Sequence, residues 1–198
     1  MPDYYTNYPR PILWLIPEGT VEIDGSPVEV EPFYISKFPV TNEQYEAFDP
    51  AFVPSPASPD ARDPAVGITW EEASEYCAWY AEVAQKPMRL PTNAEWEHAC
   101  RAGSTRRYFW GDDPARSDTY AWTAENAQGV IRALDDKQAN EHGLFGILGG
   151  VWEWTEEKVL RGGSFREPLD RCTCGVRYEV DPEESRDDVG FRIVKSLR

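Results

Sequence analysis

The chain has 198 residues, enough for one well-filled core but short for two domains, so a single domain spanning residues 1–198 is expected. Its hydrophobic content of 41%, with 8 Trp, 10 Tyr and 8 Phe, is that of a folded globular protein and argues against disorder. A formal net charge of -15 argues against nucleic acid as a partner, because such affinity comes largely from Lys and Arg.

The N-terminal residues carry no targeting signal that we recognise. Met1–Arg10 lacks a basic stretch, and the apolar run Ile12–Ile16 is too short for a signal peptide or a membrane span. We therefore expect no membrane interaction and a cytoplasmic location. Four cysteines are too few for a disulfide scaffold in a chain of this size, so each needs its own explanation.

Short strands and capped helices are expected in the first half of the chain. Between residues 12 and 38, short apolar runs alternate with Gly and Pro, which predicts an early hairpin of short strands. Three helix starts follow, each with a capping box that satisfies two backbone N–H donors. The boxes pair Thr41 with Gln44, Thr69 with Glu72, and Thr92 with Glu95.

The second of these helices has the clearest apolar face, which Ala73, Cys77, Tyr80 and Ala84 form at helical spacing. Before it, the five prolines of Pro50–Pro64 indicate a surface loop. After about residue 103, frequent Gly, Asp, Asn and Pro predict a loop-rich half. Its strands are expected at 151–154, 159–162 and 191–194, the last able to return beside the early hairpin.

Eight short segments, in order along the chain, resemble the landmarks of the formylglycine-generating-enzyme, or sulfatase-modifying-factor, family. They are Phe38–Tyr45, Val66–Trp70, Met88–Glu97, Tyr108–Asp112, Asn140–Leu144, Gly150–Trp154, Arg161–Phe165 and Gly190–Arg192. The resemblance implies an α+β, C-type-lectin-like fold with little regular secondary structure, short twisted antiparallel strands and two or three helices.

Several landmark residues have a structural explanation. Arg89 can bind carbonyls or a carboxylate through its forked guanidinium, and the large Trp side chains suit packing between loops. Paired glycines before Ser164 allow positive φ or a close backbone approach. The residues interpreted in this way are Arg89, Trp96, Trp152, Trp154, Gly162 and Gly163.

The family's enzymes, as the resemblance implies, hold copper(I) between two cysteines that follow the Gly-Gly-Ser-aromatic motif, and soft thiolates suit that ion. In this chain no thiol follows Phe165 until Cys172 and Cys174. Counting forward from Phe165 places the two catalytic positions at Glu167 and Cys172. The catalytic cysteine pair is therefore missing in this register.

Counting back from Gly190 gives a second register, which we favour. It aligns Arg177 with a recurrent family arginine and Cys174 with a structural cysteine, and it leaves no thiol at the catalytic positions. The resemblance then implies that Cys174 meets Cys100, as two thiols or as a disulfide.

An oxidase remains an alternative, because Cys172 and Cys174 form a Cys-x-Cys pair. On an extended strand both side chains would face one way and could bind Cu(I). The competing explanation is that one or both are buried as small apolar residues.

Calcium is a second metal that the resemblance implies, held by side-chain and backbone oxygens. Gly150 stands where the family usually has Asn, which removes one oxygen ligand. The candidate ligands in this chain are Asn126 and Asp135 at one site, and Gly149, Val151 and Glu153 at another.

The leading functional hypothesis is a non-catalytic module that binds a protein or a small molecule through residues 166–188. Variable proteins of diversity-generating retroelements are similarly built, with varied positions between the same two motifs. The candidate contact residues are Arg166, Glu167, Asp170, Arg171, Tyr178, Glu179 and Arg186. The alternatives are a divergent copper-dependent oxidase acting on a peptide or small thiol, and an accessory domain acting with a polypeptide from a neighbouring gene.

Overall fold

The computed structural model describes residues 9–197, and its first three helices begin where the capping boxes predict, whereas the short fourth helix was not expected. The helices are α1 (Asn42–Glu46), α2 (Trp70–Ala84), α3 (Asn93–Arg101) and α4 (Ser117–Tyr120), with 3-10 turns η1 (Pro114–Arg116), η2 (Leu134–Asp136) and η3 (Leu169–Arg171). Thr69 and Thr92 accept hydrogen bonds from the backbone N–H groups of Glu72 and Glu95. No helix in this part of the chain is long and apolar enough to cross a membrane.

Nine short strands within residues 9–197 form three small sheets. The first has the order β1-β4-β9, from Leu13–Ile16, Phe33–Ser36 and Val194–Ser196. The second is the hairpin of β2 (Gly19–Ile23) and β3 (Ser26–Val30). The third has the order β7-β6-β5-β8, from Arg177–Glu179, Val159–Arg161, Trp152–Trp154 and Val189–Phe191. All pairings are antiparallel except β5 with β8, which is parallel.

The strand boundaries differ from the prediction in two places. Phe33–Ser36 lies outside the early hairpin, and pairs with β1 and β9 instead. The expected strand at 191–194 is divided between β8 and β9, which belong to different sheets. The two strands pair with different partners, β8 with β5 and β9 with β4, and the fully buried Arg192 lies between them. The return of the chain's end beside Phe33–Ser36 is confirmed.

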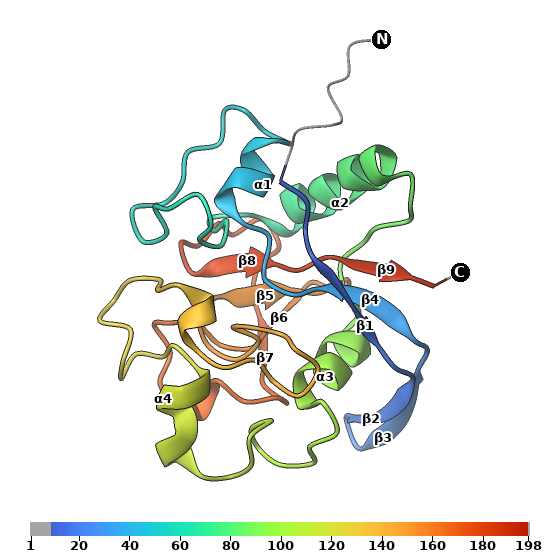
Figure 1. Ribbon diagram of the computed structural model, residues 1–198, viewed down its shortest axis with the longest axis vertical. Coiled ribbons are helices and arrows are strands. Elements are labelled where there is room, and N and C mark those ends of the chain that lie inside the picture. The colour runs from blue at the N-terminus through green and yellow to red at the C-terminus, as the bar shows by residue number, and fades with distance from the viewer. Residues whose placement is uncertain (1–8, 198) are drawn as a thin grey trace.

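Helices cover both sides of the strands: α1 and α2 lie on one side of β5, β8 and β9, and α3 and α4 lie on the other (Figure 1). Trp96, Trp152 and Trp154 are fully buried between these layers, as expected for core residues. The predicted face of α2 is also buried at Ala73, Cys77 and Tyr80, with Tyr76 added. Long loops from residue 102 onward complete the fold, as the Gly- and Asp-rich sequence indicated.

One buried ion pair, between Arg192 and Glu153, joins several separate elements of the fold. Arg192 donates from Nε to both carboxylate oxygens of Glu153, at 2.8 and 3.0 Å, and both side chains are fully buried. Its other nitrogens donate to the carbonyls of Ser36, Lys37 and Phe145. Trp96 Nε1 on α3 donates to Glu153 Oε2 at 2.8 Å. The pair therefore connects β5, the end of β4, α3 and the loop at residue 145.

We predict that Glu153→Ala lowers the free energy of unfolding by about 3–5 kcal/mol, because the substitution leaves the Arg192 guanidinium buried without a counter-charge. Urea unfolding followed by circular dichroism measures this. Glu156→Ala is the control, since Glu156 is 51% exposed and lies 3.8 Å from Arg89. The control should cost less than about 1 kcal/mol. Equal losses in the two variants would contradict the central role of the pair.

Candidate functional site

The segment 166–188 begins at a backbone turn that only glycine tolerates well. Gly162 and Gly163 have φ of 94° and 78°. A side chain on Gly162 would lie 2.9 Å from the Ile147 carbonyl oxygen, and one on Gly163 would lie 2.9 Å from Cys172 Cα. Both glycines are therefore needed for close approach as well as for positive φ, as the sequence suggested.

A buried hydrogen bond closes the two ends of the segment. Ser164 Oγ donates to Asp188 Oδ2 at 2.8 Å, and both residues are buried. Arg186 binds both oxygens of Asp188 at 3.0 Å, and Arg166 pairs with Asp187 at 2.5 Å across the surface above. We call the contact of Ser164, Asp188 and Arg186 the clasp. It fixes where the segment leaves and re-enters the core.

The predicted contact residues divide into two groups. Tyr178 stacks on Trp152 with ring centroids 5.6 Å apart, and the guanidinium carbons of Arg171 and Arg186 lie 5.7 and 5.5 Å from the Tyr178 ring. Glu167 lies 3.4 Å from Arg171. These residues form a cluster on β7 and its flanks. Arg166 lies at the start of the segment, where it pairs with Asp187.

The other two predicted residues lie apart from this cluster. Glu179 is exposed on β7, and Asp170 is exposed beside a shallow cavity of about 520 Å³. Arg107 Nη2 donates to the Asp170 carbonyl at 2.8 Å, and Glu125 accepts from Leu169 N at 3.2 Å. Sequence reasoning missed Arg107, Glu125 and Asp188. Arg107 is next to the Tyr108–Asp112 landmark, but nothing in the sequence places it against Asp170.

The geometry does not fit a copper site made by Cys172 and Cys174. The Cys-x-Cys pair lies in a bend and a turn, so the extended strand that would align the thiols is absent there. Cys172 is fully buried and contacts the Ser164 carbonyl oxygen at 3.8 Å. Burial, and then the carboxylates of Glu167 and Glu125, raise the pKa of the Cys172 thiol and disfavour the thiolate that binds metal.

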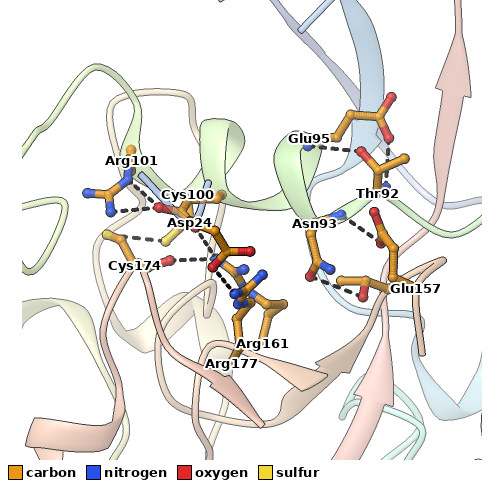
Figure 2. A network of polar contacts seen from close by, with 12 residues as sticks. Asp24, Thr92, Asn93, Glu95, Cys100, Arg101, Glu157, Arg161, Cys174 and Arg177 are labelled. Carbon is orange, nitrogen blue, oxygen red and sulfur yellow. Dashed lines mark hydrogen bonds and ion pairs between the residues drawn. The ribbon is translucent and has the colours of Figure 1, made fainter. Parts of the chain in front are cut away.

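Cys174 instead faces Cys100, with 3.5 Å between the two sulfurs, as the favoured register implies (Figure 2). Burial raises the pKa of the Cys100 thiol. Beside the thiols, Arg161 is fully buried and donates to Glu97 at 2.5 Å and to the Cys174 carbonyl at 2.9 Å. Arg177, which the sequence placed here as a structural residue, lies closer to the surface and pairs with Asp24 of the β2–β3 turn.

The calcium candidates are not gathered into one site. Both oxygens of Glu153 bind Arg192 and Trp96, so they are not free for a cation. Asn126 Nδ2 donates to Asp118 Oδ1 and to the Ala121 carbonyl. Asp135 is exposed in η2.

Gly149 and Val151 are the other candidates, through their main-chain carbonyls. Gly149 forms a bridge with Trp122, and Val151 is buried in the core. The cation near Asn126 is Lys137, whose ammonium donates to the Asp118 carbonyl at 2.6 Å. Among residues 9–197, no three His, Cys, Asp or Glu side chains are placed to hold a metal ion. Calcium binding stays a prediction.

The fold is a mixed α/β scaffold whose exposed, charged segment 166–188 is closed at its ends by a buried hydrogen bond. Residues 7–197 match the sulfatase-modifying factor enzyme 1-like domain, and the chain belongs to that family. It is 31% identical over 157 residues to the mouse protein named inactive C-alpha-formylglycine-generating enzyme 2, covering 67% of this chain and 49% of that one. It is 30% identical over 166 residues to mouse formylglycine-generating enzyme, covering 65% and 43%. The chain thus spans about half the length of these relatives.

Solved structures share the fold along nearly the whole chain. Treponema denticola variable protein 1 superposes with a TM-score of 0.82 at 21% identity, covering 93% of this chain and 94% of that one. PvdO from Pseudomonas aeruginosa superposes with a TM-score of 0.81 at 22% identity, covering 94% and 95%. At these identities the likeness establishes the formylglycine-generating-enzyme-like fold, and the fold expectation is confirmed.

We predict that mild oxidation joins Cys100 to Cys174 and leaves Cys77 and Cys172 free, because 3.5 Å between sulfurs requires little movement to form the bond. Mass spectrometry of the digested protein, after blocking free thiols, should show one linked peptide pair. Cys100→Ala is the control and should abolish it. A linked pair containing Cys172 would contradict the geometry.

We predict no stoichiometric Cu(I) site that depends on Cys172 or Cys174. An anaerobic Cu(I) titration against a competing chelator compares the parent with Cys172→Ala and Cys174→Ala, and Cys77→Ala on α2 is the matched control. All four proteins should behave alike, because the raised pKa of the buried Cys172 thiol disfavours its thiolate. Loss of one equivalent of bound Cu(I) in Cys172→Ala or Cys174→Ala would revive the oxidase hypothesis.

Proposed function

We propose that this domain is a non-catalytic binding module whose contact surface is the segment 166–188. The observation that carries the proposal is the contrast between the segment's buried ends and its exposed middle. Its ends are fixed by the buried clasp, whereas Arg166, Asp170, Arg171 and Glu179 between them are exposed. Side chains held on a fixed backbone lose little conformational entropy when they bind, which favours affinity.

The segment is also supported along its length by distant parts of the chain. Ala124 N donates to the Glu167 carbonyl at 2.9 Å, and Gly67 N donates to the Arg186 carbonyl at 2.9 Å. Trp70 N donates to the Pro182 carbonyl at 3.0 Å. These bonds use backbone atoms of the segment, so its exposed side chains remain available for a ligand.

The nature of the side chains supports a protein or small-molecule ligand. Arg and Tyr are enriched at binding hot spots, and the Arg171, Tyr178 and Arg186 cluster presents both beside exposed acids. Relatives of this chain include one named inactive and a structure named as a variable protein, which accords with a scaffold used without the family's chemistry. A polypeptide from a neighbouring gene fits this proposal as a partner.

The decisive experiment compares two sets of surface substitutions. In the first, Arg166, Asp170, Arg171 and Glu179 are replaced together by Ala. In the control, the exposed Glu75, Glu82 and Lys86 of α2 and its end are replaced by Ala. Both proteins should unfold within about 0.5 kcal/mol per substitution of the parent, because exposed side chains contribute little to stability.

Affinity capture from an extract of the source organism should recover the same partner with the parent and the α2 control. The segment variant should bind that partner at least about tenfold more weakly, the effect of losing one hot-spot residue. Equal binding by the two variants would show that the contact surface lies elsewhere. A partner lost from both variants would point to general charge effects and would also overturn the proposal.

A further inference from the structure

The outer edge of β1 is an apolar strand edge that no other described strand covers. β1 pairs with β4 alone, so it ends the β1-β4-β9 sheet on one side (Figure 1). Ile12, directly before the strand, is 58% exposed, and Trp14 and Leu15 within it are each 48% exposed. Among residues 9–197 only two other large apolar side chains, Val53 and Leu197, are exposed in this way. Most of the exposed large apolar side chains therefore gather on one strand edge.

The β1 edge lacks the features that usually keep a strand edge from pairing. Natural proteins protect such edges with charged side chains or bulges, but residues 11–17 carry no charge and β1 pairs with β4 in an unbroken register. Trp14 is also held in place by its neighbours. One side of its ring rests against Gly143, and the Lys37 ammonium lies 5.8 Å from the ring centroid. The edge is therefore preformed, and pairing orders few side chains.

The backbone groups that point outward from this edge belong to Leu13 and Leu15. Lys37 N donates to the Ile12 carbonyl at 2.8 Å, so Ile12 is turned toward the chain that forms β4. Alternate residues of an antiparallel strand turn their N–H and C=O groups to the same side. Trp14 is therefore also turned toward β4, whereas Leu13 and Leu15 direct their N–H and C=O groups away from it.

The sequence of this edge reads the same in both directions. Residues 11–17 are Pro-Ile-Leu-Trp-Leu-Ile-Pro. Two antiparallel copies centred on Trp14 place Leu13 opposite Leu15, the two residues whose backbone groups face outward. The prolines lack an N–H and end the ladder on both sides. In the same register Arg10 falls opposite Glu18, so the ends of the two strands bring opposite charges together.

We propose that β1 pairs antiparallel with β1 of a second copy of this chain, about a twofold axis at Trp14. Leu13 of each copy exchanges backbone hydrogen bonds with Leu15 of the other, and the joined sheet has the order β9-β4-β1-β1-β4-β9. The two Trp14 rings form an aromatic pair across the axis. Complementarity of an edge to itself, in sequence and in bond direction, favours a second copy over an unrelated strand. A contact made by one short strand is smaller than the standard of about 800 Å² per partner, so the dimer is weak and reversible.

Sedimentation velocity of the purified full chain tests the proposal. In about 0.3 M NaCl, which screens the repulsion between two chains of net charge -15, the parent should change from monomer to dimer between about 10 µM and 1 mM. Val53→Glu is the control, because Val53 is an exposed apolar residue outside β1, and it should match the parent. A parent that stays monomeric to about 1 mM would overturn the proposal.

Two opposite substitutions test the register. Trp14→Glu and Trp14→Lys each place like charges opposite each other at the axis, so each variant alone should self-associate at least about tenfold more weakly than the parent. An equimolar mixture of the two should recover association, because a carboxylate then faces an ammonium. Circular dichroism checks that both variants fold. A mixture that associates no better than either variant, or a Val53→Glu control that is weakened equally, would contradict the pairing.

Disulfide cross-linking gives a second readout if a charge at position 14 prevents folding. In the proposed register the two copies of residue 14 form a non-hydrogen-bonded pair, with Cα atoms about 4.5 Å apart, which is within the range that a disulfide spans. Mild oxidation of Trp14→Cys should therefore give a covalent dimer, whereas Val53→Cys should stay mainly monomeric. The native cysteines are buried and do not compete. Equal cross-linking of the two variants, or none in Trp14→Cys, would overturn the proposal.

Discussion

The buried pair of Arg192 and Glu153 is the interaction on which the rest of the fold depends. Strands of three to five residues cannot supply many ladder hydrogen bonds, and the loops between them present many backbone groups to the interior. Arg192 satisfies three of those carbonyls while its charge is balanced by Glu153. Such a pair is weak evidence of net stability, but removing one partner is costly, so it holds the fold to one arrangement.

A second group of buried polar side chains that satisfy one another lies beneath the 166–188 segment. There Ser164 and Asp188 are buried polar groups that satisfy each other, and Arg186 adds the counter-charge. Glycines at 162 and 163 let the backbone reach this contact. The clasp fixes the ends without help from the exposed side chains, whereas Cys172 and Cys174 within the segment are buried in the core. Substitutions at the exposed positions alone should leave the fold intact, as the proposed binding surface requires.

Local patterns in the sequence were enough to predict the helices and the buried tryptophans. Each capping box lies within four residues, so no knowledge of the rest of the chain was needed for Thr41, Thr69 and Thr92. The strand pairing was less accessible, because short strands carry weak patterns and their partners are distant: β9 pairs with β4 across 160 residues of chain. The break between β8 and β9 could not be seen either, because it depends on the two strands pairing with different and distant partners, β5 and β4. Glu153 was a calcium candidate because of its motif, and its pairing with Arg192 could likewise not be seen in the sequence.

The loop that leads from α1 to α2 supports the 166–188 segment, and this explains how that proposed surface can be preformed. Gly67, near the end of the loop, donates its N–H to the Arg186 carbonyl and accepts from Ser185 Oγ. Just before Gly67, Ala65 and Val66 are buried, and Ala65 N donates to the Val40 carbonyl at 2.8 Å. The loop is therefore fixed from within rather than held by the 166–188 segment. A substitution at an exposed position of the segment need not move the loop, because the loop is packed in the core.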